Sequence, residues 1–255
     1  MDCGDLLKDD ILNQAIVPGD TGKLILAGNQ ISDDLALKNT FESLESVFEI
    51  QIHGNRLTKL DEGMFAQNCN LEVLSLGHGN HGMQMDSNVF LGADKLKILD
   101  LGKWYRLQET MSNCPIVSGF AETNITRNLF DPLGELTYLF LQSNVFPVIS
   151  SNFFQQNTNV EYIDATNSKV TKLSIDAFRS NAKLAQLLLR QNQLDMIEDG
   201  TFDALADLEW IDLGRNQLTV VTAALFVNNS NLRIIDLGKI GPEREHLYKV
   251  VPLLS

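Results

Sequence analysis

The side chains best suited to chemistry in this sequence recur along the chain at a spacing of 24 residues. Nine aromatic, aliphatic and charged residues share or closely follow this spacing: Tyr138, Phe140, Tyr162, Asp164, Leu188, Arg190, Trp210, Asp212 and Arg215. Large aromatic groups beside ion-pairing groups provide contact area at a low cost in side-chain entropy. That combination is typical of surfaces that bind a partner without covalent chemistry.

Motifs that carry catalysis are missing from the sequence. It contains no G-x-S-x-G elbow, no H-E-x-x-H zinc motif and no phosphate-binding glycine loop. His53, His78 and His81 would lie close together at the ends of neighbouring strands, but no carboxylate or cysteine completes a tight ligand spacing. We therefore predict no metal, no cofactor and no enzymatic activity, and we expect these histidines to be solvated.

The cysteines Cys3, Cys69 and Cys114 are too few for a disulfide scaffold and too dispersed for a zinc site. Their odd number leaves at least one thiol free within the chain or pairs it with another segment. A bridge between Cys69 and Cys114 is the pairing that a folded-back loop would permit.

A repeat positions these side chains. The stretch LAQLLLRQNQLDMIEDGTFDALAD, residues 184–207, is followed by LEWIDLGRNQLTVVTAALFVNNSN, with apolar residues and an asparagine at the same offsets. Similarity at a fixed period is the strongest sign of architecture that a sequence carries. The same frame begins nine times: at Thr21, Val47, Leu71, Leu96, Leu136, Val160, Leu184, Leu208 and Leu232.

Each frame predicts a short strand, a turn at an asparagine and an irregular return segment closed by a phenylalanine. This phenylalanine stands six residues before each new frame: Phe41, Phe65, Phe90, Phe130, Phe154, Phe178, Phe202 and Phe226. One repeat cannot bury its apolar face alone, so neighbours must stack into a solenoid. The expected fold is α/β, a curved horseshoe with about nine parallel strands on its concave face and an irregular convex side.

Asparagines at the turns should point inward and satisfy backbone groups that no longer belong to the sheet. The frame predicts this role for Asn29, Asn55, Asn144, Asn192 and Asn216. In the repeat from Leu71 an extra residue moves the turn asparagine to Asn80, and in the repeat from Val160 the frame assigns it to Asn167.

The residues between the buried leucines should form columns on the concave face, because side chains alternate along a strand. The nine residues named first lie in or beside these columns, and we predict that they form a partner-binding face. The aspartates of the central column, Asp164 and Asp212 among them, have an alternative role. They could pair with neighbouring arginines and only neutralise charge.

The chain is expected to form one domain. Residues 1–20 would cap the first repeat, residues 21–240 hold the repeats, and residues 241–255 are either a C-terminal cap or the cut end of a longer chain. The repeat at residues 96–135 has 40 residues, and its excess, within residues 102–128, should project as a loop. Trp104 and Tyr105 should pack on the concave rim and join the binding surface. The alternative is that the loop is a tolerated insertion with no role in binding.

The net charge of −13 argues against a nucleic-acid backbone as ligand and favours a protein partner with a basic or neutral surface. No apolar run approaches the roughly 18 residues of a membrane span, so we expect no direct membrane insertion. The acidic first twenty residues do not resemble a signal peptide, although one could have been removed. Sequons at Asn124 and Asn228 are candidates for glycosylation and fit an extracellular setting.

The period and its closing phenylalanine resemble the typical class of leucine-rich repeat. This class occurs in Toll-like receptor ectodomains, insect immune leucine-rich repeat proteins, the Slit group and jawless-vertebrate variable receptors. The resemblance implies a non-catalytic protein-binding module, the ectodomain of a secreted or cell-surface receptor or of an adhesion or immune protein. It carries over no functional residue, because the matching positions belong to the core. The alternative is a matrix component or cytoplasmic adaptor that acts by self-association.

Overall fold

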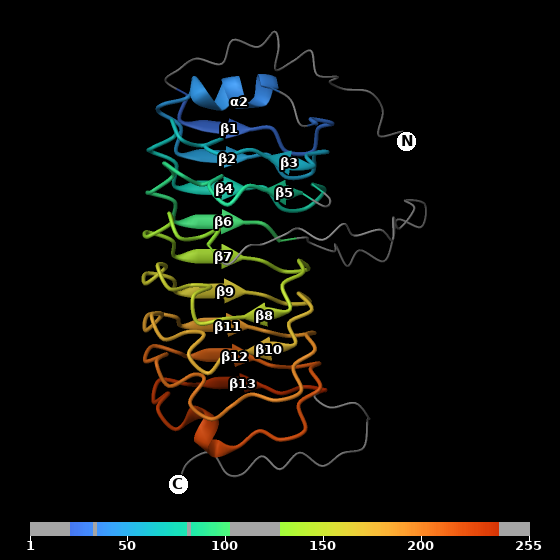
Figure 1. The fold of residues 1–255 in the computed structure, drawn as a ribbon, viewed down its shortest axis with the longest axis vertical. Helices are drawn as coiled ribbons and strands as arrows, with labels where there is room; N and C mark the ends of the chain where they lie inside the picture. Colours follow the sequence, from blue (N-terminus) through green and yellow to red (C-terminus); the bar gives the residue numbers. More distant parts are fainter. Residues whose placement is uncertain (1–20, 33–34, 81–82, 103–127, 240–255) are drawn as a thin grey trace, which may run out of the picture.

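The computed structural model describes residues 21–32, 35–80, 83–102 and 128–239. Nine strands form one parallel sheet along the stack of repeats (Figure 1). In spatial order they are β1 (Lys23–Ile25), β2 (Glu49–Gln51), β4 (Val73–Ser75), β6 (Ile98–Asp100), β7 (Tyr138–Phe140), β9 (Tyr162–Asp164), β11 (Gln186–Leu188), β12 (Trp210–Asp212) and β13 (Ile234–Asp236). The expected parallel-strand solenoid is confirmed, and each strand of this sheet lies in its predicted frame.

The register of the sheet aligns equivalent residues of all nine repeats. Leu187 lies opposite Ile163 on one side and Ile211 on the other, and the middle residue of each of these three strands is fully buried. The flanking residues therefore point to the opposite face, called the concave face below. Strands β6 and β7 pair directly although 37 residues separate Asp100 from Tyr138 in sequence. The sheet is therefore continuous across the long repeat.

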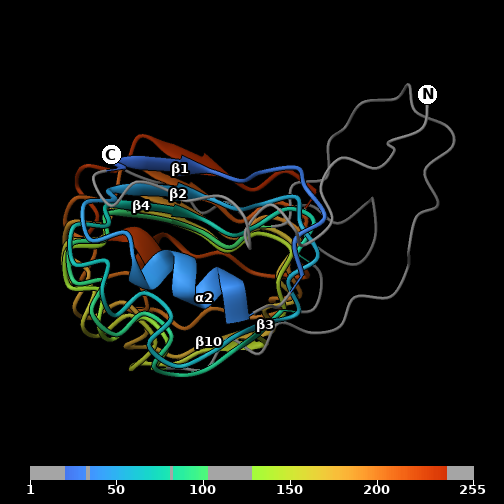
Figure 2. The same ribbon diagram turned by 90° about the horizontal axis from the view of Figure 1, so that it is seen from above.

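The return segments lie on the side opposite the main sheet, as Figure 2 shows for β3 and β10. They contain two short parallel pairs: β3 (Lys59–Leu60) with β5 (Gln84–Met85), and β8 (Val148–Ile149) with β10 (Lys172–Leu173). The first return segment contains the helix α2 (Leu35–Glu42), and that of the repeat from Leu208 contains the 3-10 turn η1 (Ala223–Phe226). The sequence frame predicted an irregular convex side and did not predict these elements.

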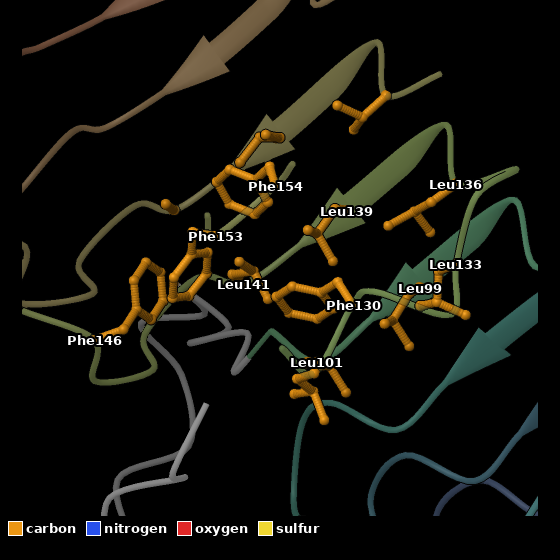
Figure 3. Close-up of a cluster of buried hydrophobic side chains, with 14 of the residues drawn as sticks. Leu99, Leu101, Phe130, Leu133, Leu136, Leu139, Leu141, Phe146, Phe153 and Phe154 are labelled. Atoms are coloured by element: carbon orange, nitrogen blue, oxygen red, sulfur yellow. The ribbon is translucent and has the colours of Figure 1, made fainter. Parts of the chain in front are cut away.

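The predicted phenylalanines form a ladder through the core. The first seven are fully buried, and Phe226, in the penultimate repeat, is 6% exposed. Neighbouring rings stack with centroids 5.4 Å apart for Phe41 and Phe65 and 5.8 Å apart for Phe202 and Phe226. Phe153 and Phe146 extend the ladder sideways, so that four phenylalanine rings, those of Phe130, Phe146, Phe153 and Phe154, form one cluster in the core (Figure 3).

The turn asparagines bind backbone groups, as predicted, and most of them bind groups of two repeats. The Nδ2 of Asn192 donates to the carbonyls of Ala165 at 2.9 Å and Leu189 at 2.8 Å, and its Oδ1 accepts from the N–H groups of Ser168 and Val170. Asn55, Asn80, Asn144 and Asn216 donate in the same way and are buried. Asn29 is only partly buried and donates to Leu26 alone among the described residues.

The assignment of Asn167 to the turn position is wrong. Asn167 is exposed with a φ of 56°, and the next residue, Ser168, is fully buried in its place. The Oγ of Ser168 donates to the carbonyl of Leu141 at 3.0 Å. A hydroxyl thus replaces the amide because it can reach the same carbonyl of the preceding repeat.

A second set of buried asparagines stands three residues after the ladder phenylalanines, and sequence reasoning missed it. Its members are Asn68, Asn157, Asn181 and Asn229. The Nδ2 of Asn181 donates to the carbonyls of Phe154 at 3.1 Å and Asn157 at 3.0 Å, both in the preceding repeat. The other three repeat this arrangement, which ties each return segment to its neighbour.

Several expectations fall on residues outside the described part of the chain. These are the terminal caps at 1–20 and 241–255, the loop at 103–127 with Trp104, Tyr105 and Asn124, and the thiols of Cys3 and Cys114. They stay predictions.

Candidate functional site

Three aromatic rings from two adjacent strands meet on the concave face. Tyr138 and Phe140 come from β7 and Tyr162 from β9, and we call them the aromatic cluster. The ring of Tyr162 lies 5.1 Å from that of Phe140 and 6.1 Å from that of Tyr138, measured between centroids. Tyr138 is 40% exposed, whereas Phe140 and Tyr162 are half-buried. The sheet fixes the backbone of all three residues, because each lies in a paired strand.

Trp210 and Leu188 stand apart from this cluster. Gln186 separates Tyr162 from Trp210 across the sheet, and no ring contact joins Trp210 to the cluster within the described residues. Trp210 is half-buried, and its indole Nε1 is buried without a hydrogen-bond partner. The predicted aromatic run therefore divides into a compact three-ring cluster and a separate tryptophan.

The aspartates of the central column all hold the backbone of the turn that follows their strand. In each, Oδ1 accepts a hydrogen bond from the N–H two residues later, at 2.7 to 2.9 Å, in Asp100, Asp164, Asp212 and Asp236. Asp164 and Asp212 are only 9% and 8% exposed. A structural role for these carboxylates is therefore established beside any role in binding.

Arg190 neutralises the C-terminal pair of these aspartates. Its Nη1 lies 3.5 Å from Asp212 Oδ1 and 3.3 Å from Asp236 Oδ2, so one guanidinium spans two repeats. Gly214 makes room for it, because a Cβ at that position would lie 2.6 Å from Arg190 Nη1. Arg215, also predicted to bind a partner, is exposed at the following turn.

Asp164 has no such cation in the part of the chain that the structure describes. None of the ion pairs among the described residues includes it. Burial raises the pKa of Asp164, the hydrogen bonds from Thr166 oppose this rise, and the charges of Asp212 and Asp100 add to it. Burial also raises the pKa of Tyr162 to about 12, with a further contribution from the charge of Asp164. The carboxylate next to the aromatic cluster is thus desolvated, and its hydrogen bonds come from Thr166 and not from a cation among the described residues.

A serine, a histidine and an aspartate meet on the N-terminal half of the concave face. Ser75 Oγ lies 3.1 Å from His53 Nδ1 and donates to Asp100 Oδ2 at 3.3 Å. In this row of contacts the serine lies between the histidine and the aspartate. Activation of a serine nucleophile requires the histidine to lie between the serine and the carboxylate. The arrangement therefore does not activate Ser75, and sequence reasoning missed it because the three residues come from three repeats.

The histidines and cysteines that the sequence offered as metal or disulfide candidates form no such site among the described residues. The described residues hold no group of three metal-ligating side chains, and His81 lies outside them. Cys69 carries a free thiol at an exposed position, and Cys114, its expected partner, falls outside the described ranges. The bridge between them stays a prediction.

Two family profiles match the sequence. The profile described as "Leucine rich repeat" matches residues 134–194 and 182–239, and the profile described as "BspA type Leucine rich repeat region (6 copies)" matches residues 35–118. This chain is a leucine-rich repeat protein. The named resemblance is confirmed, and both matches fall on the repeats that build the sheet.

Solved structures share the fold of this leucine-rich repeat protein. TLR13 in the TLR13–ssRNA13 complex superposes with a TM-score of 0.69 at 22% identity, over 84% of this chain and 28% of TLR13. Toll in the Drosophila Toll–Spatzle complex has a TM-score of 0.68 and an identity of 23%, over 84% of this chain and 30% of Toll. Internalin C2 of Listeria monocytogenes has a TM-score of 0.63 and an identity of 20%, over 85% of this chain and 80% of internalin C2.

These likenesses establish the fold. The leucine-rich repeat protein described here spans about three tenths of the length of TLR13 and of Toll. A comparison with curated protein sequences gives no match.

Proposed function

We propose that the chain is a non-catalytic recognition module that binds a protein partner through the concave face, with the aromatic cluster at the centre of the contact. The observation that carries this proposal is the cluster itself: three rings held by adjacent strands, with Tyr138 40% exposed. Aromatic anchors on a rigid support lose little entropy on binding and dominate the energy of many interfaces. Leu188, Trp210, Arg190 and Arg215 would extend the contact.

A protein partner is favoured over a nucleic acid by charge. The net charge of −13 repels phosphate groups, and the concave face presents four aspartates in one column. One structural relative is named as a complex with single-stranded RNA and another as a complex with Spatzle, so the fold by itself permits either class. The acidic surface supports a partner with a basic or neutral face.

We further propose that this module belongs to the ectodomain of a secreted or cell-surface protein with a role in adhesion or immunity. The likeness to Toll and TLR13 supports it. Asn228 supports it independently, because it is exposed and begins a sequon. Among the described residues, no helix has the length and apolarity needed to cross a bilayer. Mass spectrometry of the native protein tests this compartment, since N-linked glycan at Asn228 requires passage through the secretory route.

Affinity measurements test the binding face. The partner would be isolated with the wild-type chain, and its dissociation constant would be compared for wild type, Tyr162→Ala and Trp210→Ala. Each substitution should weaken binding by at least about 1 kcal/mol, roughly fivefold, while the fold stays intact. Glu161→Ala is the matched control, because Glu161 precedes Tyr162, is exposed and lies outside the cluster. Affinities equal to wild type in both aromatic variants would place the site elsewhere.

A further inference from the structure

A pair made of an aromatic residue and an aspartate occurs twice on the concave face. In only one of the two pairs does a cation among the described residues neutralise the carboxylate. On β12, Asp212 follows Trp210 by two residues, and on β9, Asp164 follows Tyr162 by two residues. Residues two apart on a strand point to the same face. The first carboxylate is paired with Arg190, whereas the second has no cation among the described residues.

The residues that precede each motif explain the difference. Arg190 comes six residues into its repeat, and the equivalent position of the repeat before Asp164 is Gln142. Gln142 is neutral and buried, and its side chain lies over Gly102 of the preceding repeat. Thr166 stands where Gly214 opens a path for the guanidinium of Arg190. Within the described ranges, therefore, no cation pairs with Asp164, and Thr166 does not leave the path that Gly214 leaves for Arg190.

Two aromatic residues, Phe140 and Tyr162, are neighbours of Asp164 on the sheet. Phe140 lies directly opposite Asp164 across the two strands, and the rings of Phe140 and Tyr162 are 5.1 Å apart. A cation over these rings would gain from their quadrupoles and from the adjacent carboxylate together. Although Asp164 is only 9% exposed, a cationic group can still reach its carboxylate. Asp212 is buried to a similar extent, and its Oδ1 lies 3.5 Å from Nη1 of Arg190.

We propose that the aromatic cluster and Asp164 form a docking site for one cationic side chain, arginine or lysine, of the protein partner. This inference rests on the proposed function and specifies the chemistry of its central contact. The guanidinium or ammonium group would lie on Tyr162 and Phe140 and pair with Asp164, as Arg190 pairs with Asp212 one motif further along the sheet. The raised pKa of Asp164 is consistent with a carboxylate that lacks its counter-charge.

The test uses small probes in place of the unidentified partner. N-acetyl-arginine amide is titrated into the whole chain, and the ring signals of Tyr138 and Tyr162 are followed by nuclear magnetic resonance. N-acetyl-citrulline amide has the same shape without the charge and serves as the comparison. The arginine probe should bind at least about threefold more tightly than the citrulline probe, as expected from a cation–π contact supported by a carboxylate.

Two variants locate the charge that matters. Asp164→Asn keeps an oxygen that accepts the hydrogen bond from Thr166, and it should reduce the preference for arginine to nearly that of citrulline. Asp236→Asn removes an equal charge from the same column at a position already paired with Arg190, and it should retain the preference. Tyr162→Leu, which removes the ring and keeps the charge, should weaken both probes.

Equal binding of the arginine and citrulline probes to the wild-type chain would overturn the inference. So would an unchanged preference in Asp164→Asn, or an equal loss in Asp164→Asn and Asp236→Asn. These outcomes leave the proposed function separately testable, because Tyr162→Ala would still weaken the native partner through lost contact area.

Discussion

The ladder phenylalanines are the single residues on which stability depends most. Phe178 is fully buried and packs between Phe154 and Phe202 with centroid distances of 6.1 and 6.2 Å. Phe178→Ala should lower the free energy of unfolding by about 3–5 kcal/mol, because it empties a site enclosed by two repeats. Chemical denaturation measures this loss. Glu161→Ala should leave the free energy within about 0.5 kcal/mol of wild type, and equal stability of both variants would contradict the stacked core.

Asp164 should destabilise the folded chain in its charged form. Its pKa is raised in the folded state, so the native chain holds this proton at pH values where the unfolded chain has released it. Stability conferred by the proton is complete below the ordinary aspartate pKa and is lost as the pH rises through the raised value. Asp164→Asn should therefore gain stability relative to wild type as the pH rises through that window. Unfolding measured from pH 3 to pH 7 would reveal it, and a constant difference would disprove it.

At the residue scale, sequence reasoning succeeds where one residue type holds a position in every repeat. The phenylalanine spacing has no exception, and its burial follows. The second asparagine set was missed because Leu44, Leu133 and Leu205 occupy the same position in other repeats, so no single pattern marks it. The path of Arg190 across two repeats depends on the missing Cβ of Gly214, and a sequence frame does not show side-chain paths.

Among the elements, the turns after the main strands differ between the two halves of the stack. Glycine holds the left-handed position at Gly28, Gly54 and Gly79, whereas the later repeats hold side chains there. These are Ser143, Asn167, Gln191, Arg215 and Lys239, with φ between 54° and 62°. A left-handed conformation costs a residue with a Cβ about 1 kcal/mol or more, and glycine avoids this cost.

Gln191→Gly should therefore stabilise the chain, by about 0.5–1 kcal/mol once the greater freedom of glycine in the unfolded state is included. Gln191 is exposed, so the lost side chain leaves no cavity. Thermal unfolding checks the sign. Gly79→Ala is the opposite case, because its Cβ would lie 2.5 Å from the Cα of Gly54, and it should destabilise. A lower melting temperature for Gln191→Gly would show that the turn is not strained.

The main strands were predictable because their alternation and period agree, and the register then followed from the frame. Helix α2 and the short pairs β3–β5 and β8–β10 were not predictable in this way. Their backbone pairing depends on how neighbouring return segments approach one another, which the repeat consensus leaves open. The same limit applies to the binding face: the columns were predicted, while the separation of Trp210 from the aromatic cluster required the register and ring positions.

For the whole molecule, the sheet should tolerate removal of most of the excess in the long repeat. Ile98 pairs with Tyr138 in the same register as every other neighbour, so both ends of the insertion are fixed by the sheet. Deleting residues 112–126 and joining the ends with a short Gly-Ser link should cost less than about 1 kcal/mol, since loop closure depends weakly on length. Calorimetry measures this cost. A chain that no longer unfolds cooperatively would show that the segment belongs to the core.

The claim that the concave face binds the partner is tested most directly by hydroxyl-radical footprinting of the complex. Tyrosine, tryptophan and methionine side chains all react, so the chain carries its own control. Tyr138 and Tyr162 should be protected by the partner, whereas Met196, 64% exposed on a return segment, should react as in the free chain. Protection of Met196 with unchanged reactivity of Tyr138 and Tyr162 would contradict the account and place the partner on the convex side.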